Sequence, residues 1–222
     1  MCRFVLQGIF LWAFIIISNL TFSQTPNTVK DVDGFEYKIV KLGTQTWMTQ
    51  NLNVTRFRNG DPIPEATTED EWIKAEKNKT PAWCYYQNDP ENGGNYGKLY
   101  NWYAVTDERG LAPAKWRIPA SEDWQRLINY LGKKEKAGEQ LKADSGWRDE
   151  GHGNNKSGFK ALPGGNRSDR GVFHSIGSFG YWWSSQEHGS ETAEGYDMGY
   201  RYKTINRFAF RKGNGFSVRC VK

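Results

Sequence analysis

The clearest pattern in the chain is a helical one between residues 121 and 131. Apolar side chains recur there at intervals of three and four residues, at Trp124, Leu127, Ile128 and Leu131. Positions with this spacing lie on one face of an α-helix, so the pattern predicts a helix that packs on the rest of the domain. Ser121 is the predicted N-cap, and Gly132 is predicted to end the helix.

Shorter patterns predict the other elements of the first two thirds. Alternating or aromatic runs predict strands over residues 32–40, 45–48 and 83–86. Short helices are expected over 68–77 and around Leu99, Trp102 and Tyr103. Residues 144–180 are rich in glycine, serine, asparagine and basic residues and show little periodicity, which predicts a long irregular loop region.

Alternation returns in the last third of the chain. One parity holds Tyr196, Met198, Tyr200 and Tyr202, and the other parity holds Asp197, Arg201 and Lys203. This pattern predicts a hairpin that turns near residues 204–206 and returns through Arg207, Phe208, Phe210 and Arg211. A final strand is expected to point Phe216, Val218 and Cys220 toward the core. Trp182 and Trp183 point in opposite directions if their segment is extended, so at least one of them is expected in the core.

Residues 1–23 have the features of a secretory signal. One basic residue, Arg3, precedes an apolar stretch from Ile9 to Ile17, and small residues precede a cleavage site after Ser23. The stretch is shorter than the roughly 20 residues that span a bilayer, which disfavours a retained anchor, and Cys2 lies too early to be a lipoprotein's acylated cysteine. We therefore expect an exported protein, secreted or held in the cell envelope without a membrane span. A polar lead is expected over 24–30 and a single domain over 31–222.

Composition favours a binding scaffold. Ten tryptophans, 11 tyrosines and 12 phenylalanines supply large apolar area, and the Trp and Tyr side chains keep a polar tip. They indicate a loop-rich core joined by side-chain hydrogen bonds. The net charge is +5, becomes +4 when Arg3 leaves with the signal, and contains no run of five like charges. This balance predicts no nucleic-acid partner.

Several phrases occur in a characteristic order. The most specific are Gln45-Thr46-Trp47-Met48, Trp83-Cys84-Tyr85-Tyr86, Trp116-Arg117-Ile118-Pro119, Gly180-Tyr181-Trp182-Trp183-Ser184-Ser185 and Gly215-Phe216-Ser217-Val218-Arg219-Cys220-Val221. In these phrases the chain resembles the Fibrobacter succinogenes major paralogous domain (FISUMP) family of exported bacterial proteins. That family is similar to the wider C-type lectin-like group, which includes the formylglycine-generating enzymes. The resemblance implies an α+β fold with small twisted antiparallel sheets, two main helices and a long irregular loop region.

Two departures from the family pattern change the expectations. Ala112-Pro113 stands where relatives commonly have Cys-Pro, so Cys84 and Cys220 are the two cysteines left after signal cleavage. An oxidising compartment lets them pair, and we expect a Cys84–Cys220 disulfide, the alternative being two buried free thiols. Ala120 stands where the family has a capping threonine, which moves the expected cap to Ser121.

The residues do not indicate catalysis. Formylglycine-generating chemistry needs a close pair of reactive cysteines, and the histidines His152, His174 and His188 lack the short spacing of zinc ligands. Glu187 with Asp197 is the conceivable glycosidase pair, although a sequence does not give the separation of two carboxylates. Calcium is a weak candidate, and its oxygen donors would be Asp144, Asp149, Glu150, Asn154 and Asn155, which follow no EF-hand spacing. We expect no cofactor and no enzymatic activity.

The segment between Ser185 and Gly213 is the predicted binding site. Aromatic rings stack on sugars or anchor proteins, and guanidinium groups bind carboxylate or sulfate. The predicted ligand-binding residues are Glu187, Tyr196, Tyr200, Arg201, Tyr202 and Arg207. In the alternative interpretation, the tyrosines belong to the core and the basic side chains are simply exposed to solvent. The expected ligand is a glycan or another surface protein. Two rival functions are a structural envelope component without a specific ligand and an exported hydrolase or oxidase.

Overall fold

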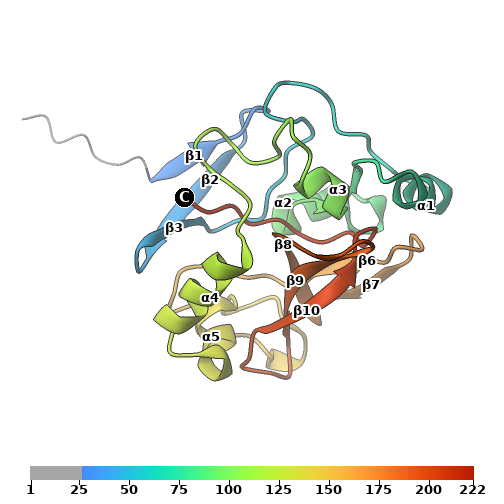
Figure 1. The fold of residues 1–222 in the computed structure, drawn as a ribbon. Helices are drawn as coiled ribbons and strands as arrows, with labels where there is room; N and C mark the ends of the chain where they lie inside the picture. The colour runs from blue at the N-terminus through green and yellow to red at the C-terminus, as the bar shows by residue number, and fades with distance from the viewer. Residues whose placement is uncertain (1–26) are drawn as a thin grey trace, which may run out of the picture.

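The computed structural model describes residues 27–222, and the predicted signal peptide lies outside them. The described residues form an α+β domain with small antiparallel sheets, a curled mixed sheet and five helices (Figure 1). None of these helices combines the length and apolar character needed to cross a membrane. The helices are α1 (Glu69–Asn78), α2 (Glu91–Tyr96), α3 (Trp102–Val105), α4 (Ser121–Tyr130) and α5 (Lys134–Leu141), and short 3-10 turns cover Tyr86–Asn88 and Arg148–Glu150.

The strands form three sheets. The first has the order β1 (Thr28–Lys30), β2 (Glu36–Leu42), β3 (Gln45–Met48), and the second pairs β4 (Trp83–Cys84) with β5 (Leu99–Tyr100). The third has the order β10-β9-β8-β6-β7, with β6 (Gly164–Arg167), β7 (Phe173–Ile176), β8 (Phe179–Gly189), β9 (Thr192–Gly199) and β10 (Asn206–Arg211). It is mixed because β6 runs parallel to β8 at Gly165 and Gly180, whereas its other pairs are antiparallel.

Several predicted elements are confirmed, and others are wrong. The strand over 45–48 and the helices near 68–77 and 121–131 are present. The polar lead contains β1, Leu99 lies in β5 rather than in a helix, and the strand at residue 83 ends at Cys84. The predicted irregular region 144–180 contains the β6–β7 hairpin. The prediction of two main helices also missed α5, which follows α4 directly.

The cap of α4 differs from the prediction. Ala120 is the N-cap residue, and the Asp123 carboxylate accepts a hydrogen bond from the Ala120 N–H at 2.9 Å. Ser121 is the first residue of the helix, and its hydroxyl instead donates to Glu194 of β9. The predicted cap at Ser121 is therefore wrong, because a carboxylate one turn later satisfies the start of the helix.

Asp123 makes the domain sensitive to acid. Burial raises the pKa of this carboxylate, but hydrogen bonds from Arg117, the Ala120 N–H and Arg126 outweigh burial and bring the pKa to about 2. The unfolded state has a pKa of 3.8, so it binds the proton more tightly than the folded state does. The free energy of unfolding should therefore fall by about 2 kcal/mol between pH 4 and pH 2. Urea unfolding at several pH values measures this loss.

Two variants isolate the contribution of Asp123 to this loss. Asp123→Asn should lose this part of the acid dependence. The exposed neighbour on the same helix provides the control, because Glu122→Gln should keep it. An unchanged pH profile in Asp123→Asn would assign the acid loss to other groups.

The closing segment, residues 215–221, joins the three sheets. Bridges connect Phe216 to Tyr100 of β5, Ser217 to Trp182 of β8, and Val221 to Trp47 of β3. Phe216, Val218 and Cys220 are buried as predicted, but the residues between them are buried too, at 2% exposure for Ser217 and 1% for Arg219. The segment is thus a central connection enclosed on both sides and is not a regular edge strand.

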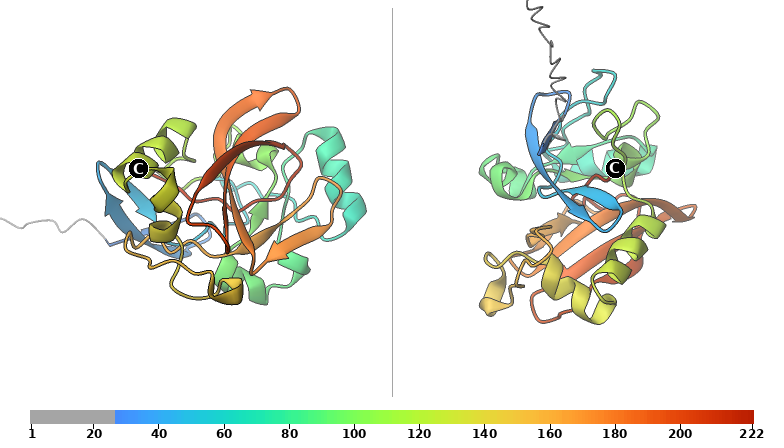
Figure 2. Two further views of the ribbon diagram at one scale, coloured as in Figure 1. Left: turned by 90° about the horizontal axis from the view of Figure 1, so that it is seen from below. Right: turned by 90° about the vertical axis from the view of Figure 1, so that its left-hand side faces the viewer.

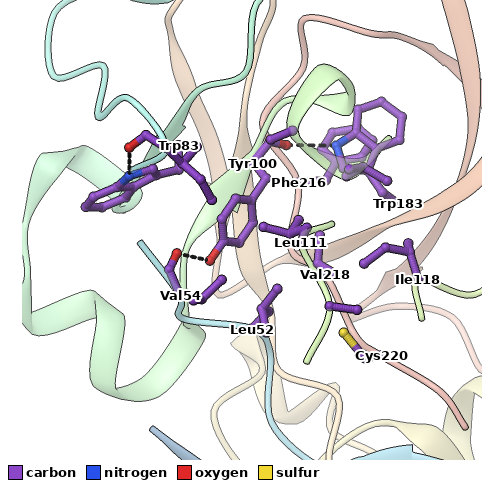
Figure 3. Close-up of a cluster of buried hydrophobic side chains, with 14 of the residues drawn as sticks. Leu52, Val54, Trp83, Tyr100, Leu111, Ile118, Trp183, Phe216, Val218 and Cys220 are labelled. Carbon is purple, nitrogen blue, oxygen red and sulfur yellow. Dashed lines mark hydrogen bonds between the residues drawn. The ribbon is translucent and has the colours of Figure 1, made fainter. Parts of the chain in front are cut away.

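The aromatic core depends on side-chain hydrogen bonds, as the composition predicts. In the cluster of Figure 3, the Tyr100 hydroxyl donates to the Val54 carbonyl at 2.7 Å, and the Trp183 indole donates to the Tyr100 carbonyl at 2.8 Å. Trp182 and Trp183 are both fully buried, on opposite faces of β8. Val54 lies in irregular backbone, and the bond from Tyr100 satisfies its buried carbonyl group.

The predicted disulfide is not formed. Cys84 and Cys220 are free thiols, and they are buried in two different clusters of the core. Burial raises the pKa of Cys84 to about 12 and raises that of Cys220 as well. Because the thiolate is the reactive form of cysteine, neither side chain is a poised nucleophile.

Candidate functional site

The structure separates the predicted ligand-binding residues. Tyr196 is only 2% exposed and stacks on Trp124 of α4, with ring centroids 4.8 Å apart and planes inclined by 23°. Burial raises the pKa of its phenol, and the hydroxyl donates to the Ser121 carbonyl at 3.4 Å. Tyr196 is therefore largely a core residue, as the alternative interpretation of the tyrosines has it.

Tyr200, Arg201 and Tyr202 lie in the connection between β9 and β10. The Arg201 guanidinium carbon is 5.1 Å from the centroid of the Tyr200 ring, and Tyr202 is 54% exposed. The Tyr202 carbonyl accepts a hydrogen bond from the buried ammonium of Lys142 at 2.9 Å, which fixes the connection to the loop region behind it. Arg201 and Tyr202 are exposed, whereas Tyr200 is half-buried and packs against the core cluster that contains Tyr196.

Glu187 is engaged by the protein itself. Its carboxylate pairs with the ammonium of Lys212, which also donates to the Ser190 carbonyl at 2.8 Å and lies 4.7 Å from the centroid of the Trp102 ring. Asp197, its conceivable catalytic partner, is 7% exposed and accepts a hydrogen bond from Asn206 at 3.0 Å.

The positions of these two carboxylates do not suit a glycosidase. Asp197 pairs with Tyr181, which precedes Glu187 by six positions along β8. Glu187 itself pairs with Ala193, four positions before Asp197 along β9, because β8 contains bulges. At about 3.3 Å per residue the Cα atoms of Glu187 and Asp197 are therefore roughly 13–20 Å apart. A glycosidase pair is about 5–9.5 Å apart.

A cavity of about 660 Å³ lies between α4 and the β9–β10 hairpin. Figures 1 and 2 show that α4 and α5 lie beside this hairpin. We call it the helix–hairpin groove. It is lined by Gln125, Ile128, Asn129, Lys133, Lys134, Glu135, Tyr196, Ile205, Asn206, Arg207 and Phe208. Of the residues predicted to bind a ligand, it brings together Tyr196 in the floor and Arg207 at the rim.

Helix α4 supplies one wall of the groove. Its apolar face buries Trp124, Leu127 and Ile128 in the same cluster as Tyr196, which fixes the helix against the sheet. The exposed face of α4 presents Gln125 and Asn129, and the Gln125 side-chain amide donates to the Asn129 side-chain oxygen at 2.9 Å. An amide pair one helical turn apart offers both donors and acceptors to a ligand.

The hairpin and α5 supply the other wall. Arg207 of β10 lies directly opposite Tyr196 of β9, so both side chains share the face that α4 covers. Phe208 follows Arg207 and lies on the other face of the strand, where its ring is 6.0 Å from that of Phe210. Helix α5 is tied to the hairpin connection because Gly138 packs on Thr204. An added Cβ at Gly138 would lie 2.4 Å from the Thr204 carbonyl oxygen.

The groove has an excess of positive charge. Lys133, Lys134 and Arg207 are exposed at its rim, and Glu135 is the acidic residue among them. Arg207 lies 3.8 Å from Glu194, whereas neither lysine forms a salt bridge with any residue between 27 and 222. The apolar floor and cationic rim suit a polar ligand that carries negative charge.

The described residues contain no group of three or more His, Cys, Asp or Glu side chains that could hold a metal ion. Among the predicted calcium donors, Asn154 and Asn155 accept local backbone hydrogen bonds from Lys156 and Lys160. Asp149 pairs with its neighbour Arg148 at 3.7 Å. The geometry thus gives the calcium hypothesis no support.

Sequence reasoning missed Gln125, Asn129, Lys133 and Lys134. A signal for the first two was present, because Gln125 and Asn129 lie four residues apart on the polar face of a helix that was predicted correctly. The two lysines follow the predicted stop at Gly132. Their meeting with Arg207 depends on tertiary structure, and no local pattern encodes it.

The fold and the groove together define an α+β domain with a surface cavity on rigid elements. The chain belongs to the Fibrobacter succinogenes major domain family, whose model matches residues 40–222. This match confirms the resemblance seen in the spaced aromatic phrases. Comparison with curated proteins and with solved structures gives no match.

Proposed function

We propose that the protein is an exported, non-catalytic binding protein with a C-type lectin-like fold, and that it holds a glycan in the helix–hairpin groove. The observation that carries the proposal is the groove itself. It combines an amide pair, a cationic rim and an apolar floor on elements anchored in the core. Saccharide hydroxyls need closely spaced donors and acceptors, and a preorganised site reduces the entropy lost on binding.

The described side chains favour binding over catalysis. The two carboxylates that could have formed a glycosidase pair occupy distant rows of the sheet, and each already has a partner. The two thiols that an oxidase would need are buried apart, with pKa values raised by burial. A hydrolase or oxidase would have to use other groups.

A glycan array with the purified protein tests the proposal. Wild-type protein should bind a subset of bacterial and plant polysaccharides. The double variant Gln125→Ala/Asn129→Ala should lose at least about tenfold in affinity, because two hydrogen-bonding side chains are removed. Alanine is well tolerated on a helix surface, so folding should be preserved. Circular dichroism and the Tm of each variant check this.

The matched control is Tyr200→Ala/Arg201→Ala, which removes a half-buried ring and an exposed guanidinium group outside the groove. It should bind as wild type does. Binding lost in this control and kept in the groove variant would move the site to the hairpin connection. Absence of binding across the array would reject the glycan proposal and favour a protein partner or a structural envelope component.

A further inference from the structure

The rim of the helix–hairpin groove is positively charged, and a neutral sugar has no charged group that would interact with it. Glu135 is the acidic residue among those that line the groove, and Arg207 also lies 3.8 Å from Glu194, so Lys133 and Lys134 supply the charge at the rim that is unpaired among residues 27–222. The start of α5, which lines the same rim, has no side-chain cap at Lys133. The positive end of the helix dipole therefore adds to the field of the three cations.

The backbone of Lys133 is strained at the mouth of the groove. Its φ is 79° and its ψ is 166°, a conformation that glycine adopts freely and lysine does not. Gly132, just before it, has a φ of 86°. A glycine at position 133 would relieve the strain, yet the chain places an exposed cation there, at the mouth of the groove.

We propose that the groove selects anionic saccharides, whose carboxylate or sulfate groups contact Lys133, Lys134 and Arg207. This inference rests on the proposed function and adds the chemical class of the ligand. The cations supply charge-assisted hydrogen bonds to the anionic substituents. Gln125 and Asn129 supply the bonds to hydroxyl groups, which neutral and anionic saccharides share.

Dextran sulfate and dextran are matched probes, because they share a backbone and differ in sulfate. Polygalacturonate and its methyl-esterified form make the same comparison for carboxylate. Calorimetric titration at 50 and 200 mM NaCl should give tighter binding of the anionic member in at least one pair. Added salt should weaken that binding by screening the charges.

Lys133→Gly should weaken binding of the anionic probe about three- to tenfold and leave the neutral probe unchanged. Its Tm should stay level or rise, because glycine removes the strain. Lys133→Gln keeps the strained backbone and removes the charge, so it should lose the same affinity. The triple variant Lys133→Gln/Lys134→Gln/Arg207→Gln should lose most of the preference and most of the salt dependence.

Lys115→Gly is the control for general charge effects. Lys115 is also an exposed lysine with a positive φ, of 67°, but it lies outside the groove. Equal loss of binding in Lys115→Gly and Lys133→Gly would overturn the inference, because the attraction would then come from net charge. Equal affinity for charged and neutral probes, with binding still lost in Gln125→Ala/Asn129→Ala, would overturn the anionic class and leave the glycan site standing. Failure of all probes to bind would reject both.

Discussion

Replacing Arg219 with methionine is expected to lower the free energy of unfolding by about 3 to 5 kcal/mol, a large share of the stability of a small domain. Arg219 is 1% exposed, and burial lowers its pKa because its bonds go to neutral acceptors. Its guanidinium donates to the Asn51 amide oxygen at 2.6 Å, the Phe159 carbonyl at 2.5 Å and the Met48 carbonyl at 3.3 Å. Methionine fills similar space and leaves these acceptors buried with fewer donors.

Urea denaturation compares this variant with Arg148→Met. The Arg148 side chain is 65% exposed, so its replacement should change the free energy of unfolding by less than about 0.5 kcal/mol. Equal stability of Arg219→Met and wild type would mean that the cost of burying the guanidinium cancels the gain from its bonds. That outcome is known for some buried ion pairs replaced by apolar residues.

Lys142→Met is expected to release the loop region behind the β9–β10 hairpin. The Lys142 ammonium is buried and donates to the carbonyls of Gly151 at 2.6 Å, Gly199 at 3.2 Å and Tyr202 at 2.9 Å. It therefore ties the loop to the end of β9 and to the hairpin connection. Loss of these bonds should cost about 2 to 3 kcal/mol, since three buried carbonyls lose a charged donor.

Hydrogen–deuterium exchange locates this effect. Amides in residues 151–158 and 199–205 should exchange faster in Lys142→Met, and those of β2 and β3 should stay protected. Lys156→Met removes an exposed lysine of the same loop and should leave the exchange pattern unchanged. Faster exchange across the whole domain in Lys142→Met would show global destabilisation in place of local release.

The sequence predicted those elements whose stability comes from a local pattern. Helix α4 buries Trp124, Leu127, Ile128 and Leu131, the four residues that its spacing predicts. The strand over 45–48 is a short β-rich segment between turn residues, and it forms β3 with the predicted bounds. In each case neighbouring residues determine both the conformation and the buried face.

Other elements depend on partners distant in the chain. Strand β6 reads Gly-Gly-Asn-Arg and has no alternation, and it forms because β7 and β8 pair with it. Helix α5 carries Gly138 in its interior, a poor helix former that is needed where Thr204 approaches.

The prediction of the ligand-binding residues was limited for the same reason, because it depends on tertiary structure. Alternation showed that Tyr196 and Asp197 lie on opposite faces of β9, but both faces are buried. Sequence periodicity therefore identified the hairpin and did not identify which of its side chains reach solvent.

The central position of residues 215–221 has a consequence for folding. Arg219 and Asn51, which bond directly, are 168 positions apart in the sequence, and the same segment pairs with all three sheets. Contacts of this range close large loops of chain before they gain stabilisation, which slows folding. The three sheets cannot be joined through this segment until residue 221 has emerged from the ribosome, so the growing chain stays open until then. The export that we propose needs an unfolded chain during its passage through a narrow channel, and this late closure is compatible with it.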